Sequence, residues 1–362
     1  MIGDNDMLKV YIDEKALSSI CLEEMSKPIE EQCDWFRILS KQETIYYISS
    51  NGDDIFLDDD NPLMLFSQAM QLDYENASAY IKGVLTDNSR VLEQPCAAFL
   101  LDVDPQTAEK IQKDYGVLVQ PTQSLDTGVA GTLEIGEAYS FDNGESGCSW
   151  KYVLDGIKDV PSNSLFIIDR NLFANDSQSR RNGIDNIQNI LDSVLPETFA
   201  GVYQIAIVFD PGTLHKDCTY EYIATELNKL KKTLNKTYTI SISVIGLNVA
   251  SQYYADTHNR RILSNYYWVY ADHKLCAFVN NHSNASQYMT VNGLYAYLST
   301  MKGNRDAASN KEHTKLIRKF SDLIKELRRL IDNESIRATY RLTINGNHKL
   351  SINELDNRLL SC

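Results

Sequence analysis

The chain has 362 residues, of which 43% are apolar and 23% charged, a composition typical of globular proteins that excludes wholesale disorder. A chain of this length predicts two domains. No apolar run approaches the roughly 18–20 residues that cross a bilayer, and the first residues are acidic where a secretion signal would be basic. We therefore expect a soluble cytoplasmic protein that has no membrane contact.

The charge is distributed unevenly along the chain. Residues 301–362 hold 13 Lys and Arg against 8 Asp and Glu, a net of +5, whereas residues 1–300 hold 22 against 41, a net of −19. A body this acidic is not typical of a general nucleic-acid binder, which gains affinity by neutralising phosphates. The seven cysteines contain no close pair, which argues against zinc fingers and redox dithiols.

Residues 1–135 form the first predicted unit. Buried strands, with helices between them, are predicted at 8–12, 44–49, 97–103 and 116–120. Asp104 followed by Pro105 predicts a helix start, and Gly116 predicts where that helix ends. Strand–helix alternation of this kind indicates an α/β unit with a mainly parallel sheet.

Residues 136–160 are rich in glycine and are predicted to be a connector, with one hairpin at most. A second α/β unit follows over residues 161–300. Its predicted elements are strands at 164–169, 203–210 and 238–246, helices at 181–195 and 220–234, and two further strands at 257–270 and 274–279 that could pair antiparallel. The predicted fold class is therefore α/β, with two units and mainly parallel sheets.

The last segment, 301–362, is basic and predicts two elements. Residues 311–331 place leucines and a phenylalanine at alternating spacings of three and four, which predicts an amphipathic helix. This helix could pack on the body with its bases in water, or it could bind a protein partner or nucleic acid. Asn345-Gly346 predicts a hairpin.

An aspartate follows each of four predicted strands, and a fifth aspartate, Asp104, lies two residues after Asp102. They are Asp13, Asp102, Asp104, Asp169 and Asp210. The carboxyl ends of parallel strands line the crevice where ligands bind, and gathered carboxylates would need a hard cation such as Mg²⁺ or Mn²⁺. The alternative is that each aspartate caps the helix after its strand, most clearly Asp104 before Pro105.

The segments LKVYIDEKAL and AAFLLDVDPQTAEKIQKDYGVLVQ resemble the opening and closing elements of PIN-like ribonucleases. The resemblance covers about the first 125 residues and implies that Asp13, Asp102 and Asp104 hold Mg²⁺ or Mn²⁺ and cut RNA. Glu43 is a possible match for the family's middle acid. The residues after Asp13 depart from the family pattern, and Lys15 could take the place of the metal, which would give an inactive domain.

A second constellation comprises His258, Arg260 and Arg261, at the start of a predicted strand. A histidine and an arginine on one strand face could grip a phosphate. The pattern resembles the His-x-Arg strand of phospholipase-D-like domains that have lost their catalytic pairs, over residues 161–300. The alternative is a buried structural network in which Arg260 pairs with Asp169 or Asp256.

Two functions from different classes remain open. One is a metal-dependent nuclease that acts on RNA or single-stranded nucleic acid, in a bacterial toxin or antiviral defence setting that the family resemblances imply. The other is a catalytically inactive interaction or sensor protein, built on degenerate enzyme-like folds, with the helix at 311–331 as its partner-binding element. Convergence of Asp13, Asp102 and Asp104 would favour the nuclease, and their separation would favour the inactive protein.

Overall fold

The structure is a computed structural model in which the chain divides into two compact units. It describes residues 8–28, 31–42, 44–49, 62–125, 133, 135–177, 179–246, 260–294, 343–345, 348–350 and 357–361. Of the described residues, the first unit contains those before Ile135 together with Leu294, and the second contains Ile135–Gly293 and the C-terminal pieces up to Ser361. Both units are α/β, which confirms the predicted fold class.

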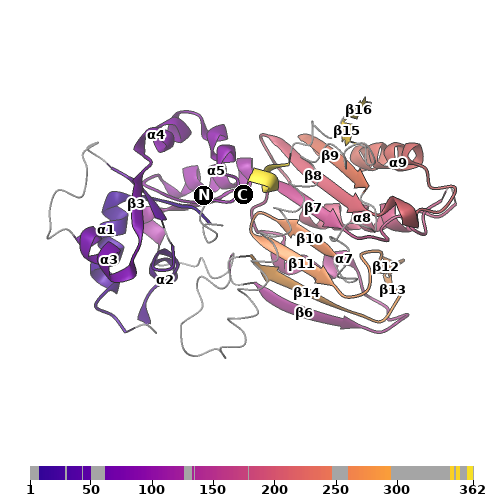
Figure 1. Ribbon diagram of the computed structural model, residues 1–362, viewed down its shortest axis with the longest axis horizontal. Coiled ribbons are helices and arrows are strands. Elements are labelled where there is room, and N and C mark those ends of the chain that lie inside the picture. The colour runs from indigo at the N-terminus through magenta and orange to yellow at the C-terminus, as the bar shows by residue number, and fades with distance from the viewer. Residues whose placement is uncertain are drawn as a thin grey trace. The chain divides into compact units, whose positions relative to one another are not determined.

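The first unit contains a five-stranded parallel sheet with the order β3-β2-β1-β4-β5 (Figure 1). Its strands are β1 (Val10–Asp13), β2 (Thr44–Ile48), β3 (Asp73–Asn76), β4 (Ala98–Leu101) and β5 (Leu118–Pro121). Its helices are α1 (Glu14–Glu24), α2 (Asp34–Leu39), α3 (Pro62–Met70), α4 (Ser78–Thr86) and α5 (Pro105–Tyr115), with short 3₁₀ turns η3 (Asn88–Glu93) and η4 (Thr122–Ser124). From β1 the chain first adds β2 and β3 on one side and then β4 and β5 on the other. The strand order therefore reverses between β1 and β4. In doubly wound sheets this switch point is where ligands bind.

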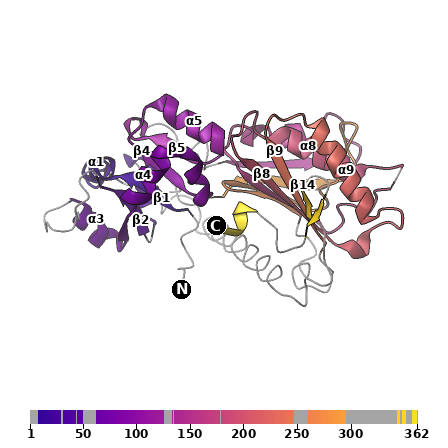
Figure 2. The same ribbon diagram turned by 90° about the horizontal axis from the view of Figure 1, so that it is seen from above.

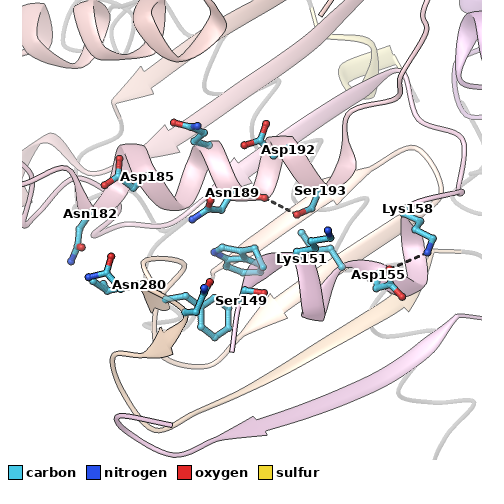
Figure 3. A pocket seen from close by; sticks show the side chains of 16 residues that line it. Ser149, Lys151, Asp155, Lys158, Asn182, Asp185, Asn189, Asp192, Ser193 and Asn280 are labelled. Atoms are coloured by element: carbon cyan, nitrogen blue, oxygen red, sulfur yellow. Dashed lines mark hydrogen bonds and ion pairs between the residues drawn. The ribbon is translucent and has the colours of Figure 1, made fainter. Parts of the chain in front are cut away.

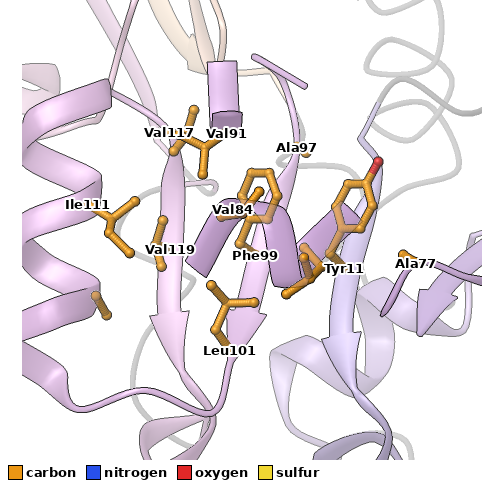
Figure 4. Packing of buried hydrophobic residues seen from close by; sticks show 12 residues of the cluster. Tyr11, Ala77, Val84, Val91, Ala97, Phe99, Leu101, Ile111, Val117 and Val119 are labelled. Carbon is orange, nitrogen blue, oxygen red and sulfur yellow. The ribbon is translucent and has the colours of Figure 1, made fainter. Parts of the chain in front are cut away.

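Apolar side chains project from both faces of this sheet, so helices cover it on both sides. On one face, Tyr11 and Phe99 pack against residues of α4, η3 and α5, including Val84 and Ile111, in one buried cluster (Figure 4). The rings of Tyr11 and Phe99 stack with centroids 5.1 Å apart. Because successive strand residues alternate in direction, Ile12 is buried on the opposite face of the sheet.

The predicted helix after Asp104 is confirmed as α5. Pro105 occupies its first turn, and Gly116 ends it in the left-handed conformation with φ of 58°. A side chain would be strained at that angle, so glycine suits the position.

The second unit contains a nine-stranded mixed sheet with the order β16-β15-β9-β8-β7-β10-β11-β14-β6. Its strands are β6 (Gly136–Phe141), β7 (Ser164–Ile168), β8 (Val202–Phe209), β9 (Thr239–Gly246), β10 (Arg261–Ser264), β11 (Tyr267–Ala271), β14 (Gln287–Gly293), β15 (Thr343–Asn345) and β16 (His348–Leu350). β7, β8 and β9 are parallel, whereas the other pairings are antiparallel. The expectation of a mainly parallel sheet therefore holds only for the centre of this unit. Two residues join β10 to β11, and so short a connection requires an antiparallel pair.

Helices of the second unit are α7 (Trp150–Val153), α8 (Asn182–Val194) and α9 (Tyr220–Thr233), with 3₁₀ turns η5 (Asp155–Ile157), η6 (Pro211–Thr213) and η9 (Arg358–Ser361). A small hairpin pairs β12 (Phe278–Val279) with β13 (His282–Ser283). Figure 2 shows α8 and α9 side by side along the strands β8 and β9. Residues 136–160, expected to be a connector, contribute β6 and α7 to this unit.

The predicted C-terminal hairpin is present as β15 and β16, with Asn345 paired to His348. The predicted helix at 311–331 lies outside the described residues. The predicted strand at 257–270 is instead the β10–β11 hairpin over its described part.

Candidate functional site

Two predicted acids lie at the switch point of the first sheet. Asp13 is the last residue of β1, and Asp102 directly follows β4. The register pairs Ile12 with Leu100, so both aspartates stand at the carboxyl ends of adjacent parallel strands.

Asp13 and Asp104 are both helix N-caps, as the cap alternative predicted. Asp13 Oδ1 accepts hydrogen bonds from the backbone N–H groups of Lys15 at 2.9 Å and Ala16 at 3.3 Å. Asp104 accepts from the backbone N–H of Thr107 at 2.9 Å and from its hydroxyl at 2.6 Å. Both hydrogen bonds lower the pKa of Asp104, and the one from the Thr107 hydroxyl has the larger effect. Both carboxylates therefore satisfy amide donors that a helix start would otherwise leave unpaired.

The three predicted metal ligands do not form a cluster. Among the described residues, no group of three or more His, Cys, Asp or Glu side chains is arranged to hold a metal ion. Asp102 is exposed, and Lys15 is exposed too, with no ion pair to any described acid. The possible middle acid, Glu43, lies outside the described residues.

Arg260 belongs to a buried network in the second unit. Its Nε lies 3.8 Å from Asp169 Oδ1, and its Nη1 donates to the carbonyl of Asp272 at 2.8 Å. Asp169 is fully buried and accepts from the backbone N–H groups of Leu275 at 2.7 Å and Asn171 at 2.8 Å. Burial raises the pKa of Asp169, against the effect of those hydrogen bonds. The alternative pairing of Arg260 with Asp169 is thus present.

The other two predicted phosphate ligands are Arg261 and His258. Arg261 places its guanidinium 5.9 Å from the ring centroid of Trp268, in a cation–π contact. His258 lies outside the described residues. Arg260 thus contacts Asp169 and Asp272, and Arg261 contacts Trp268.

A groove that the sequence did not indicate lies between α7 and α8 in the second unit (Figure 3). We name it the α7–α8 groove. It has a volume of about 800 Å³ and is lined by Ser149, Trp150, Lys151, Leu154, Asp155, Lys158, Asn182, Asp185, Gln188, Asn189, Asp192, Ser193, Phe278, Val279, Asn280 and Asn281. The α8 positions recur at spacings of three and four, which is one helix face, but a solvent-facing stripe has the same pattern.

The side chain of Asn186 on α8 forms hydrogen bonds with the two other segments that line this groove, α7 and β12. Its side-chain oxygen accepts from Trp150 Nε1 at 3.0 Å and from the backbone N–H of Phe278 at 3.2 Å. Its amide nitrogen donates to the carbonyls of Phe278 at 3.0 Å and Asn182 at 2.9 Å. A single buried side chain thus joins α7, α8 and β12, so the groove is pre-formed.

Comparisons with known proteins add no relative. No protein-family model matches the chain, and no curated protein matches it. Within the described ranges, none of the helices combines the length and apolarity that a membrane crossing requires.

Proposed function

We propose that this protein acts by binding rather than by catalysis, as an interaction or sensor protein built on two degenerate enzyme-like units. The observation that carries the proposal is the use of Asp13 and Asp104 as helix caps. A catalytic pair of metal ions requires several carboxylates that face one another with free oxygens. Two of the three candidate acids instead direct oxygens at the N–H groups of their own helices.

The acidity of the chain supports the same proposal. A nuclease must bring a polyanion to its site, and a net charge of −14 opposes that approach unless a local basic surface compensates. The predicted basic segment 301–362 is the candidate for such a surface, and in the non-catalytic proposal it contacts a protein partner instead.

A metal-dependent nuclease acting on RNA or single-stranded nucleic acid is the second candidate. It is favoured by the position of Asp13 and Asp102 on the two strands that flank the switch point. Lys15 also allows it, because its exposed side chain makes no ion pair with Asp13 among the described contacts. In this candidate, Mg²⁺ or Mn²⁺ would activate water for attack on a phosphodiester, with Asp13, Asp102 and Asp104 as ligands.

Incubation of the full-length protein with labelled single-stranded RNA and Mn²⁺ separates the two candidates. The non-catalytic proposal predicts no cleavage above a buffer control for either the wild type or Asp13→Ala. Cleavage by the wild type that Asp13→Ala and Asp102→Ala both abolish would replace the proposal with the nuclease. Equal cleavage by the wild type and both variants would identify a contaminant and leave the prediction of an inactive site intact.

A further inference from the structure

The α7–α8 groove, which lies in the second unit, has the properties of a site for a small ligand. Its volume of about 800 Å³ lies within the range of sites for small molecules. Asn186, which is 1% exposed, joins α8 to Trp150 and Phe278 through three hydrogen bonds, and a fourth ties it to Asn182 within α8. A ligand would therefore meet a site that needs little ordering on binding, which preserves affinity.

Four asparagine side chains in the groove offer hydrogen bonds that the protein itself does not use. They are Asn182, Asn189, Asn280 and Asn281. In the part of the chain that the structure describes, none of their side-chain amides has a hydrogen-bond partner. Each amide supplies two donor hydrogens and an acceptor oxygen. Figure 3 shows Asn182 and Asn280 facing each other at one end of the groove.

The backbone places two of these asparagines next to each other in a tight turn. Asn280 and Asn281 have φ of 51° and 59° and form the two-residue turn between β12 and β13. Positive φ at both central positions is the pattern of a type I′ hairpin turn, which asparagine adopts more readily than most residues. The turn thus presents adjacent amides at the mouth of the groove.

The charges in the lining disfavour strongly ionic ligands. Three aspartates and two lysines line the groove, and Asp155 pairs with Lys158 at 3.1 Å. Asp185 pairs with Arg181 at 3.5 Å, which leaves Asp192 on the α8 wall to repel a phosphate. Lys151, on the α7 side, would repel a cation. An uncharged ligand avoids both penalties.

We propose that the α7–α8 groove binds a short neutral oligosaccharide. Sugar hydroxyls both donate and accept, so they match the amides, and adjacent hydroxyls can both donate to one carboxylate such as Asp185. Trp150 and Phe278 are buried beneath this lining, at 0% and 4% exposed, so they support the walls and a sugar would meet mainly the polar side chains. From Asn182 to Ser193 the α8 wall extends about 16 Å, the length of a short oligosaccharide rather than a single sugar. The site is confined to the second unit, so it does not depend on whether the first unit cleaves RNA.

A printed array of neutral oligosaccharides, probed with the labelled full-length protein, tests this directly. Hits are then titrated by calorimetry, with AMP, spermidine and tetraglycine as anionic, cationic and peptide comparators. We expect binding of at least one neutral oligosaccharide and none of the comparators. Asn189→Ala is expected to weaken it about five- to tenfold, the effect of losing one or two hydrogen bonds.

Asn143→Ala is the matched control, because Asn143 is an exposed asparagine of the second unit outside the groove. Its affinity for the oligosaccharide should equal that of the wild type, and circular dichroism should show that both variants are folded. Absence of any hit on the array overturns the proposal. Preferential binding of AMP, spermidine or tetraglycine overturns it in favour of that ligand class. Equal affinity of the wild type and Asn189→Ala for the oligosaccharide also overturns it, because the oligosaccharide would then bind outside this groove.

Discussion

At the residue scale, Asp13 is where the two interpretations of the first unit differ most. As a cap, it needs only an acceptor that reaches the N–H groups of Lys15 and Ala16. As a metal ligand, it needs a negative charge. Serine satisfies the first requirement but not the second.

Asp13→Ala should therefore lower the free energy of unfolding by about 1 kcal/mol, because it removes the cap of α1. Asp13→Ser should restore most of that loss, since serine is a good N-cap. Urea denaturation of the wild type and both variants measures the difference. Equal stability of the alanine variant and the wild type would show that the cap contributes nothing.

Asp176 gives a second test at this scale, through pH. The carboxylate is buried and accepts from the backbone N–H groups of Gly183 at 2.6 Å and Ile184 at 3.1 Å, at the start of α8. Burial raises its pKa to about 6 from an ordinary value of 3.8. Because the folded state binds the proton more tightly, this residue's contribution to stability is greatest below the unfolded pKa and is lost as pH rises through the folded pKa.

The free energy of unfolding of the wild type, relative to Asp176→Asn, should consequently rise by up to about 3 kcal/mol between pH 7 and pH 4. Asparagine does not titrate, so it removes the linkage while leaving one acceptor oxygen for the helix start. Urea denaturation at several pH values checks this. A difference between wild type and variant that is constant over pH 4–7 would contradict the buried, titrating carboxyl.

At the element scale, the groove walls depend on the contacts of Asn186. Asn186→Ala would leave Trp150 Nε1 and the backbone groups of Phe278 without their partners. Unpaired buried polar groups are costly, so we expect the free energy of unfolding to fall by about 3 kcal/mol. Asn143→Ala, an exposed asparagine in the same unit, should change it by less than about 0.5 kcal/mol. Similar stability of the two variants would show that Asn186 does not fasten the walls.

The same scale explains which elements could be predicted from sequence. β7 and β8 are continuous apolar runs that are buried on both faces, and α8 repeats its isoleucines with helical period, so each element carries its own signal. β3 and β6 are edge strands whose residues are mostly exposed, and their polar composition resembles a loop. The cap alternative for Asp104 was predictable because a cap depends on only the next three residues. The groove was not, because it brings residues 149–158, 182–193 and 278–281 together through tertiary packing.

At the scale of the whole molecule, the last described residues, 357–361, belong to the second unit. Arg358 Nη1 donates to the carbonyls of Asn163 at 3.1 Å and Val202 at 2.8 Å, and its backbone N–H donates to Gln204 Oε1 at 2.9 Å. Leu359 is fully buried. The last described residues therefore hold the starts of β7 and β8 together.

Arg358→Ala should lower the free energy of unfolding by about 1–2 kcal/mol, because two carbonyls lose a charged donor. Arg180→Ala provides the comparison, since Arg180 is an exposed arginine of the same unit and should be near neutral. Urea denaturation, followed by tryptophan fluorescence, measures both. A loss for Arg180→Ala as large as for Arg358→Ala would indicate a general charge effect rather than this contact.

The central claim is that Asp13 and Asp104 of the first unit cap helix starts, and that Asp13, Asp102 and Asp104 do not together hold a metal ion. Calorimetric titration of the full-length protein with Mn²⁺ measures this most directly, with Asp102→Ala as the control because Asp102 is exposed and follows β4. The account predicts no saturable uptake of Mn²⁺ by either protein. Stoichiometric uptake by the wild type that is lost in Asp102→Ala would contradict it.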